Sequence, residues 1–274
     1  KYKRLKPLLS SILLLSLLSA TAFAASTSSL PVTSSDDYFE RAQKKAEQLK
    51  LMFDESVKLE TSGKLDKATL PEELKEVQGV MTAFQDDLKM ASEGGHVVAT
   101  YMLANIQSRF GMSEEERKQV CEPMHKAMDQ GLLAAGVGYY YQCDMAYMRL
   151  NLLDPGHVKY LEALKQMLLN VDPNHDYYPL YTNRSLCFEG DRLAEIKEER
   201  TLGNMQARAS ARMLTYDQYR ADAYYILAAT RMNDKGEPDS VNLTYLNQAL
   251  ALGCKDPMTL KEYYEKAFGS QASK

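Results

Sequence analysis

The sequence has no tryptophan, only four histidines and few helix-breaking residues, with nine prolines and 14 glycines among 274 residues. Long stretches therefore lack glycine and proline and are rich in alanine, leucine, methionine, glutamate and lysine, which lose little entropy in a helix. Hydrophobic residues make up 45% of the chain, which is enough to form a continuous core. This composition excludes a disordered chain and favours an all-α fold.

The sequence also lacks the motifs that mark common active sites. It contains no nucleophile elbow, no zinc-protease helix, no phosphate-binding glycine loop and no dinucleotide fingerprint. Acid pairs such as Glu189 and Asp191 are expected by chance in a chain with 37 acidic residues. The sequence therefore indicates no cofactor, no resident metal and no catalytic residue, and it favours a non-enzymatic role without excluding an enzyme.

The first 24 residues differ from the rest of the chain. They begin with four basic side chains, Lys1, Lys3, Arg4 and Lys6. An apolar run over 8–18 follows, and Ala22 and Ala24 place small residues where a signal peptidase reads them. The run is shorter than the roughly 20 residues of a membrane-spanning helix. We therefore expect a secretory signal peptide over 1–24, a periplasmic or secreted protein, and no stable membrane insertion after cleavage.

Negative charge predominates in the expected exported chain. Removing the four basic residues of the leader from the total of 33 leaves 29, against 37 acidic residues, for a net charge of about −8. Binding to a phosphate backbone requires a basic patch, and none is visible in the sequence. Nucleic acid is therefore not an expected partner.

Four cysteines in an exported chain predict two disulfides, with three possible pairings. Cys121 and Cys143 each lie eleven residues from Leu132, which falls in the turn between two expected helices. In an antiparallel helix pair they would lie at the same height, so Cys121–Cys143 is the preferred bond. Elimination then pairs Cys187 with Cys254. The alternative is four buried free thiols.

A metal site is a weaker alternative for the first cysteine pair. Cys121 and His125 lie four residues apart on one helical face and could join Cys143 and Asp144 as ligands. The other three histidines are scattered along the chain, and a disulfide accounts for both thiols. The disulfide interpretation is therefore favoured.

Apolar residues recur at steps of three and four along most of the chain, which is typical of amphipathic helices. The pattern and its glycine and proline stops predict helices over 36–60, 71–93, 114–129, 133–150, 157–170, 176–188, 216–232, 239–252 and 257–268. A longer helix over 191–214, interrupted near Gly203, is also expected. Residues 25–35 form a flexible lead-in, and 36–270 form the folded domain. No stretch alternates with period two, so we expect little or no sheet.

An internal repeat falls at several of the expected helix junctions. The pattern Ala-x-x-x-Gly-x-x-x-Ala occupies residues 91–99, recurs 36 residues later at 127–135 and returns in part at 249–253. A degenerate copy without the glycine occupies 215–223. Small residues at these positions permit a tight turn and a close approach of successive helices.

This spacing, together with the segments EGGHVVATYMLA and DQGLLAAGVGYYY, resembles the Sel-one-like repeat family, a relative of the tetratricopeptide repeats. The resemblance is clearest over 88–150 and 215–268. It implies an all-α fold built as a short superhelical stack of antiparallel helix pairs, a repeat solenoid. It also implies a protein-binding scaffold or adaptor in the bacterial envelope, or an immunity-type inhibitor that neutralises a toxin.

Eighteen tyrosines suggest a surface for such binding, because several clusters follow the repeat junctions. The candidate residues of a concave groove that binds another protein or an extended ligand are Tyr101, Tyr140, Tyr181 and Tyr224. The alternative is that these rings pack between helices. A different class of function, a periplasmic enzyme or enzyme subunit acting on cell-wall or glycan material, would use the tyrosines to stack on sugar faces.

Overall fold

The computed structural model describes residues 34–64, 70–109, 111–144, 150–188 and 201–268, and these are mostly helical. The helices are α2 (Ser35–Thr61), α3 (Leu70–Glu93), α4 (Val97–Gln107), α5 (Glu114–Asp129), α6 (Leu133–Gln142), α7 (Pro155–Leu169), α9 (Leu202–Ser210), α10 (Tyr216–Thr230), α11 (Ser240–Ala251) and α12 (Leu260–Phe268). A 3-10 turn, η1 (His175–Tyr177), precedes β1 (Leu180–Tyr181), which pairs antiparallel with β2 (Met213–Leu214). The predicted all-α fold class is confirmed.

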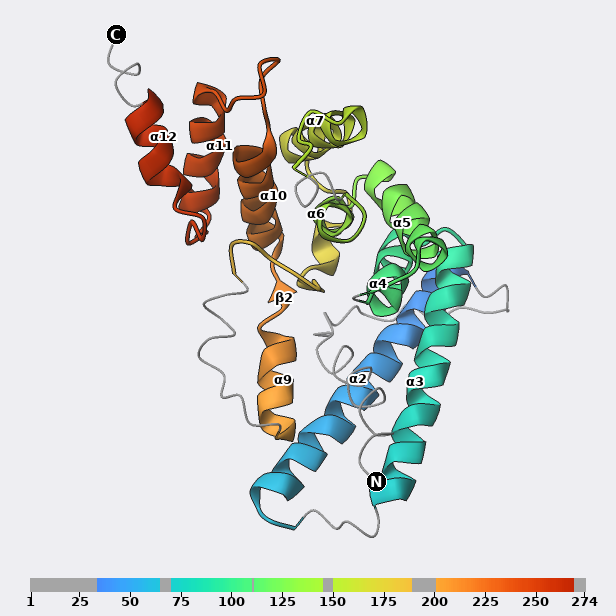
Figure 1. The fold of residues 1–274 in the computed structure, drawn as a ribbon. Coiled ribbons are helices and arrows are strands. Elements are labelled where there is room, and N and C mark those ends of the chain that lie inside the picture. The colour runs from blue at the N-terminus through green and yellow to red at the C-terminus, as the bar shows by residue number, and fades with distance from the viewer. Residues whose placement is uncertain (1–33, 65–69, 110, 145–149, 189–200, 269–274) are drawn as a thin grey trace.

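Consecutive helices pack against one another along much of the chain. Helices α2 to α7 are in contact in sequence order, and α10 to α12 form a second series. Helix α10 joins the two series by packing on α6 and α7. Figure 1 shows α2 and α3 as the longest pair, with the short α9 returning beside α2. Stacked helices are therefore present, whereas a regular superhelical solenoid stays a prediction.

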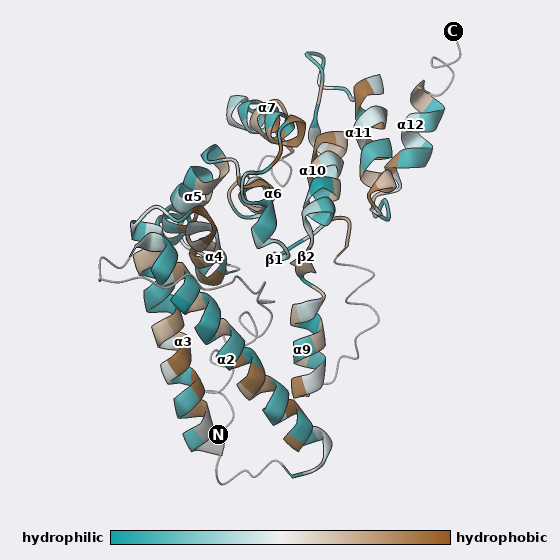
Figure 2. Ribbon diagram, turned by 180° about the vertical axis from the view of Figure 1, so that it is seen from behind, coloured by the Kyte–Doolittle hydropathy of each residue, from teal (hydrophilic) through white to brown (hydrophobic). Residues whose placement is uncertain are grey.

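The α2–α3 pair combines an apolar seam with a buried ion pair. Helix α2 begins at a capping box between Ser34 and Asp37, so the helix starts within the expected flexible lead-in. Hydrophobic and hydrophilic residues alternate along both helices in Figure 2. The carboxylate of Asp87 on α3 is buried and pairs with Arg41, at 2.5 Å, and with Lys45 on α2. The charges of Arg41 and Lys45 together compensate the buried acid.

The repeat pattern corresponds to a helix stop that occurs three times. Gly95, Gly131 and Gly253 have φ angles of 94°, 87° and 93°, a left-handed conformation that favours glycine. In each copy the residue after the glycine donates its N–H to the carbonyl of the alanine that begins the pattern, at 2.9, 3.2 and 3.1 Å respectively. These bonds define a Schellman motif. The repeated residues therefore encode helix ends.

We expect Gly131→Ala to destabilise the protein more than Gly95→Ala. Both substitutions force a Cβ into the left-handed conformation, at a cost of about 1 kcal/mol. At Gly131 the added Cβ would also lie 3.3 Å from Cδ of Pro173, whereas at Gly95 it would meet no atom within 4 Å. Urea unfolding of both variants should show about 1 kcal/mol of additional loss for Gly131→Ala. Equal losses would contradict the packing of Pro173 on this turn.

Two predicted helices differ from the structure. The helix predicted over 133–150 ends at Gln142, and 145–149 lie outside the described residues. The helix predicted over 176–188 is wrong, because this segment forms η1, β1 and a turn. Pro179 explains the second error, since proline lacks an N–H and disfavours helical geometry in the residue before it. Apolar spacing alone did not reveal this break.

The segments around Gly203 and Pro257 also differ from expectation. Helix α9 begins at Leu202, after the non-helical N-cap Thr201, next to the interruption predicted near Gly203. It ends at Ser210 instead of 214, because 213–214 form β2, and 189–200 lie outside the described residues. Gly203 is in the first turn, where backbone N–H groups have no partner within the helix. Helix α12 starts at Leu260 instead of 257, because the Asp256 carboxylate accepts hydrogen bonds from the N–H groups of Leu260 and Lys261.

The expected signal peptide and most of the lead-in lie outside the described residues. Within the part of the chain that the structure describes, none of the helices combines the length and apolar character needed to cross a bilayer. The predicted secretory leader and its cleavage therefore stay predictions.

Candidate functional site

The four tyrosines predicted to line a groove lie in different environments. Tyr101 is 1% exposed and Tyr140 is 6% exposed, so both belong to the core. Tyr181 and Tyr224 are half-buried, and the ring of Tyr224 stacks on Tyr245 with 6.3 Å between centroids. A side chain enclosed in the core has no surface to offer a ligand. The groove interpretation is therefore wrong for Tyr101 and Tyr140, which pack between helices.

Tyr101 belongs to a buried polar junction around β1. The backbone carbonyl of Tyr181 accepts hydrogen bonds from the hydroxyl of Tyr101, at 2.7 Å, and from the side-chain amide of Asn105, at 3.0 Å. The hydroxyl of Tyr219 on α10 lies 3.1 Å from the same carbonyl. Burial raises the pKa of both tyrosines well above the ordinary range, so both stay neutral donors. The junction ties α4 to α10 through β1.

Asp172 organises the segment between α7 and β1. Its Oδ2 accepts a hydrogen bond from the N–H of Leu133, at 2.8 Å, and another from the hydroxyl of Tyr178, at 2.8 Å. The side chain of Asp172 is buried. Asp172 and Pro173 form a local pattern typical of a turn and helix cap, but the carboxylate caps α6, which begins 39 residues earlier in the chain. Asp172 therefore has a structural role.

Asp144 and His157 form a buried pair that resembles the orienting half of a catalytic triad. Asp144 Oδ2 lies 2.5 Å from His157 Nδ1, and the His157 side chain is 0% exposed. Nε2 of His157 has no hydrogen-bond partner among the described residues. A general base must reach the proton that it removes, and burial keeps a substrate away from this nitrogen in the present conformation. The pair therefore acts as a packing element between α6 and α7.

Asp222 on α10 is a second buried acid. Its Oδ1 accepts a hydrogen bond from the N–H of Cys187 at 3.0 Å, and the Tyr141 hydroxyl lies 3.5 Å from the same oxygen. Oδ2 has no hydrogen-bond partner among the described residues. Burial is the largest cause of a rise in the pKa of Asp222 to about 7, and hydrogen bonds from Ser185 and Cys187 oppose it. The carboxyl holds the 185–188 turn against α10.

Both favoured cysteine pairs are disulfides in the structure. Cys121 is bonded to Cys143 and Cys187 to Cys254. The weaker metal interpretation is wrong, because the disulfide uses both thiols, and His125 instead faces Asp129 at 3.0 Å. Among the described residues, no group of three or more histidine, cysteine or acidic side chains could hold a metal ion.

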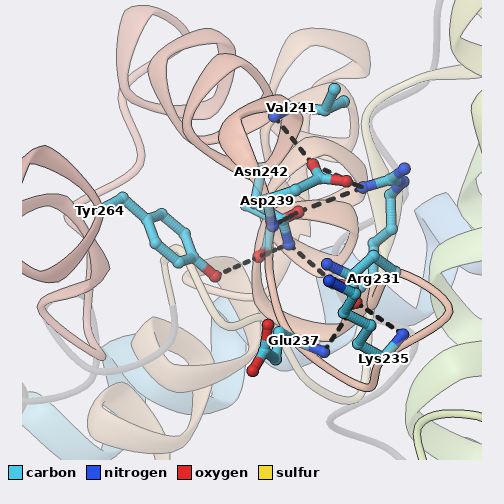
Figure 3. Close-up of polar contacts among 9 residues, drawn as sticks. Arg231, Lys235, Glu237, Asp239, Val241, Asn242 and Tyr264 are labelled. Carbon is cyan, nitrogen blue, oxygen red and sulfur yellow. Dashed lines mark hydrogen bonds and ion pairs between the residues drawn. The ribbon is translucent and has the colours of Figure 1, made fainter. Parts of the chain in front are cut away.

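The loop between α10 and α11 is fixed by side-chain hydrogen bonds (Figure 3). Arg231 donates to both carboxylate oxygens of Asp239, at 2.8 Å each. The side-chain amide of Asn242 donates to the carbonyls of Ala228 and Arg231, also at 2.8 Å. Tyr264 adds a 2.7 Å bond from α12 to the carbonyl of Ala228. These bonds hold the end of α10 to α11 and α12.

Exposed apolar side chains gather around α7. Five of the nine large hydrophobic residues that are exposed in the described parts of the chain lie within one 22-residue segment, namely Leu150, Leu153, Val158, Leu169 and Val171. We call these five residues the α7 surface. Leu150, Leu169 and Val171 are 87%, 70% and 76% exposed. Sequence analysis missed this surface, because apolar spacing does not distinguish the covered face of a helix from a bare one.

Comparison with protein-family models, with curated proteins and with solved structures gives no match to this chain. The resemblance to helical-repeat proteins therefore rests on the residue pattern alone. Because a fold does not by itself imply a function, the function has to be argued from the surface and the buried groups described above.

Proposed function

We propose that the protein is an exported helical-repeat scaffold that binds a protein chain through the α7 surface. The observation that carries this proposal is the concentration of exposed leucine and valine around one helix. Exposed apolar side chains that gather on one part of a protein surface mark interaction sites. Covering such side chains removes apolar area from water, which stabilises the complex by about 25 cal/mol per Å² of area buried. An adaptor and an immunity-type inhibitor are two forms of this activity.

The buried acids support a binding role over an enzymatic one. Asp222 is fully buried, and His157, the partner of Asp144, is enclosed between helices. Each acid bonds to the protein itself, Asp144 to His157 and Asp222 to the N–H of Cys187. An enzyme acting on glycans would instead need two carboxyl groups that converge on the scissile bond.

Export is supported by the cysteines. All four are paired in disulfides, a chemistry that persists in oxidising compartments and is rare in the cytosol. Together with the expected leader, this favours a periplasmic or secreted location.

A photoreactive amino acid placed at Leu169 is expected to crosslink the protein to one discrete protein chain in cells that export it. The same amino acid at Leu51 is the matched control, because Leu51 is an exposed leucine on α2, away from the α7 surface. Electrophoresis and mass spectrometry identify the adducts. No adduct from Leu169, or equal adducts from both positions, would contradict the proposal. Turnover of a glycan by the pure protein without an adduct would favour the enzyme.

A further inference from the structure

The exposed face of α7 carries a seam with coiled-coil spacing. Val158, Glu162, Lys165 and Leu169 follow one another at steps of four, three and four residues, which places them in one stripe along the helix. All four side chains reach solvent, with Glu162 and Lys165 59% and 41% exposed. These two already form an ion pair within the helix, with 3.3 Å between Lys165 Nζ and Glu162 Oε1, so a second copy would bring two such pairs side by side. The opposite face packs on α6 and α10 through Tyr160, Leu164 and neighbouring buried residues. The seam itself lacks a covering helix among the described residues.

The order of residues along this seam is self-complementary. Reading from either end gives an apolar residue, a charged residue, a charged residue of opposite sign and an apolar residue. A twofold axis midway along α7 would place Val158 opposite Leu169 of a second copy, and Glu162 opposite Lys165. Isologous dimers need such a match, because each residue meets its complement on the same surface of the partner.

The flanking residues agree with the same axis. Leu150 and Leu153 lie before α7, and Val171 lies just after it. In an antiparallel pairing the start of one helix lies beside the end of the other. The apolar flanks of one copy would then lie near those of the other at each end of the seam.

We infer that the protein chain bound by the α7 surface is a second copy of this chain, paired through antiparallel α7 helices about a twofold axis. This inference rests on the proposed function and names its partner. The apolar ends provide the area removed from water, and the two Glu162–Lys165 contacts set the antiparallel direction. A parallel pairing would instead place like charges opposite each other.

Charge reversal tests this pairing. Sedimentation velocity of the oxidised, purified protein over a concentration series is expected to show a monomer–dimer equilibrium. Glu162→Lys or Lys165→Glu alone places like charges opposite each other at two symmetric positions and should weaken the dimer about tenfold or more. The double variant restores opposite charges and should recover most of the affinity. Recovery is expected to be partial, because the charge of Arg231 also acts on Glu162.

Leucine variants provide the matched control. Leu169→Glu is expected to abolish the dimer, whereas Leu51→Glu, an equivalent change on exposed α2, should leave it intact; circular dichroism checks that each variant folds. A wild-type monomer at every concentration, or a dimer unaffected by Leu169→Glu, would overturn the inference. If the chain is monomeric and the crosslink from Leu169 captures a different protein, the inference fails while the proposed function stands.

Discussion

Replacing Cys187 and Cys254 together by alanine is expected to lower the free energy of unfolding by about 4 kcal/mol. The bond joins residues 67 positions apart, so it closes a loop that includes α9 and α10. Cross-linking such a loop removes conformational entropy from the unfolded chain, and the effect grows with loop length. Alanine is chosen because both cysteines are buried, and serine would place an unpaired hydroxyl in the core.

The second disulfide is the matched control for this prediction. Cys121 and Cys143 are 22 positions apart, and their joint replacement by alanine should cost about 3 kcal/mol. Urea unfolding of both variants under the same buffer conditions gives the comparison. A smaller loss for the Cys187–Cys254 pair than for the Cys121–Cys143 pair would show that loop closure does not dominate the stability contributed by the longer bridge.

Asp222→Asn is expected to stabilise the protein at pH 8 by up to about 4 kcal/mol. Burial displaces the pKa of Asp222 by about three pH units, and each unit corresponds to roughly 1.4 kcal/mol of stability. The carboxyl has a pKa of about 7 in the folded protein, against 3.8 for an exposed aspartate. Well below pH 3.8 both states are protonated and the group imposes no penalty, and at pH 4 the penalty is still small. As pH rises toward 7 folding must take up a proton, so stability is progressively lost.

The asparagine side chain is close in shape to the carboxyl and cannot ionise, so the test is the pH dependence of the difference between the two proteins. Its oxygen can replace Oδ1 and accept the N–H of Cys187, while its amide nitrogen replaces Oδ2, which lacks a partner among the described residues. Urea unfolding at pH 4 and pH 8 should show near-equal stabilities at the lower pH and a gain for the variant at the higher one. Asp217→Asn, on the exposed end of the same helix, should show no such pH-dependent gain. A gain that is the same at both pH values would contradict a titrating Asp222.

Local signals in the sequence predicted the parts of the fold that depend on neighbouring residues. Ser113 and Glu116 have the spacing of a capping box, which marks a helix start in the sequence, and in the structure they cap α5. The repeated glycines end helices because only a left-handed residue closes that turn. The equal distance of Cys121 and Cys143 from Leu132 predicted their disulfide, since a helix pair converts sequence symmetry into spatial proximity.

Contacts between distant segments could not be predicted in the same way. Asp172 caps a helix that begins 39 residues before it, and no local pattern relates the two. Tyr101 is buried because α10 and β1 cover it, which its own helix does not indicate. The seam on α7 has the spacing of a core-facing stripe, so its exposure depends on which neighbours cover the helix. The prediction that Tyr101 and Tyr140 line a groove therefore failed, because tertiary packing decides which residues are buried.

The return of α9 to α2 limits how this chain can change length during evolution or design. Arrays of repeats gain and lose units readily when each unit touches only its neighbours. Here the N–H of Leu202 donates to the carboxylate of Glu60 at 2.7 Å, across 142 positions of sequence. Inserting or deleting a helix pair between these residues would separate the two helices that this contact joins. Duplication of units is therefore best tolerated beyond α12, where no such closure has to be preserved among the described helices.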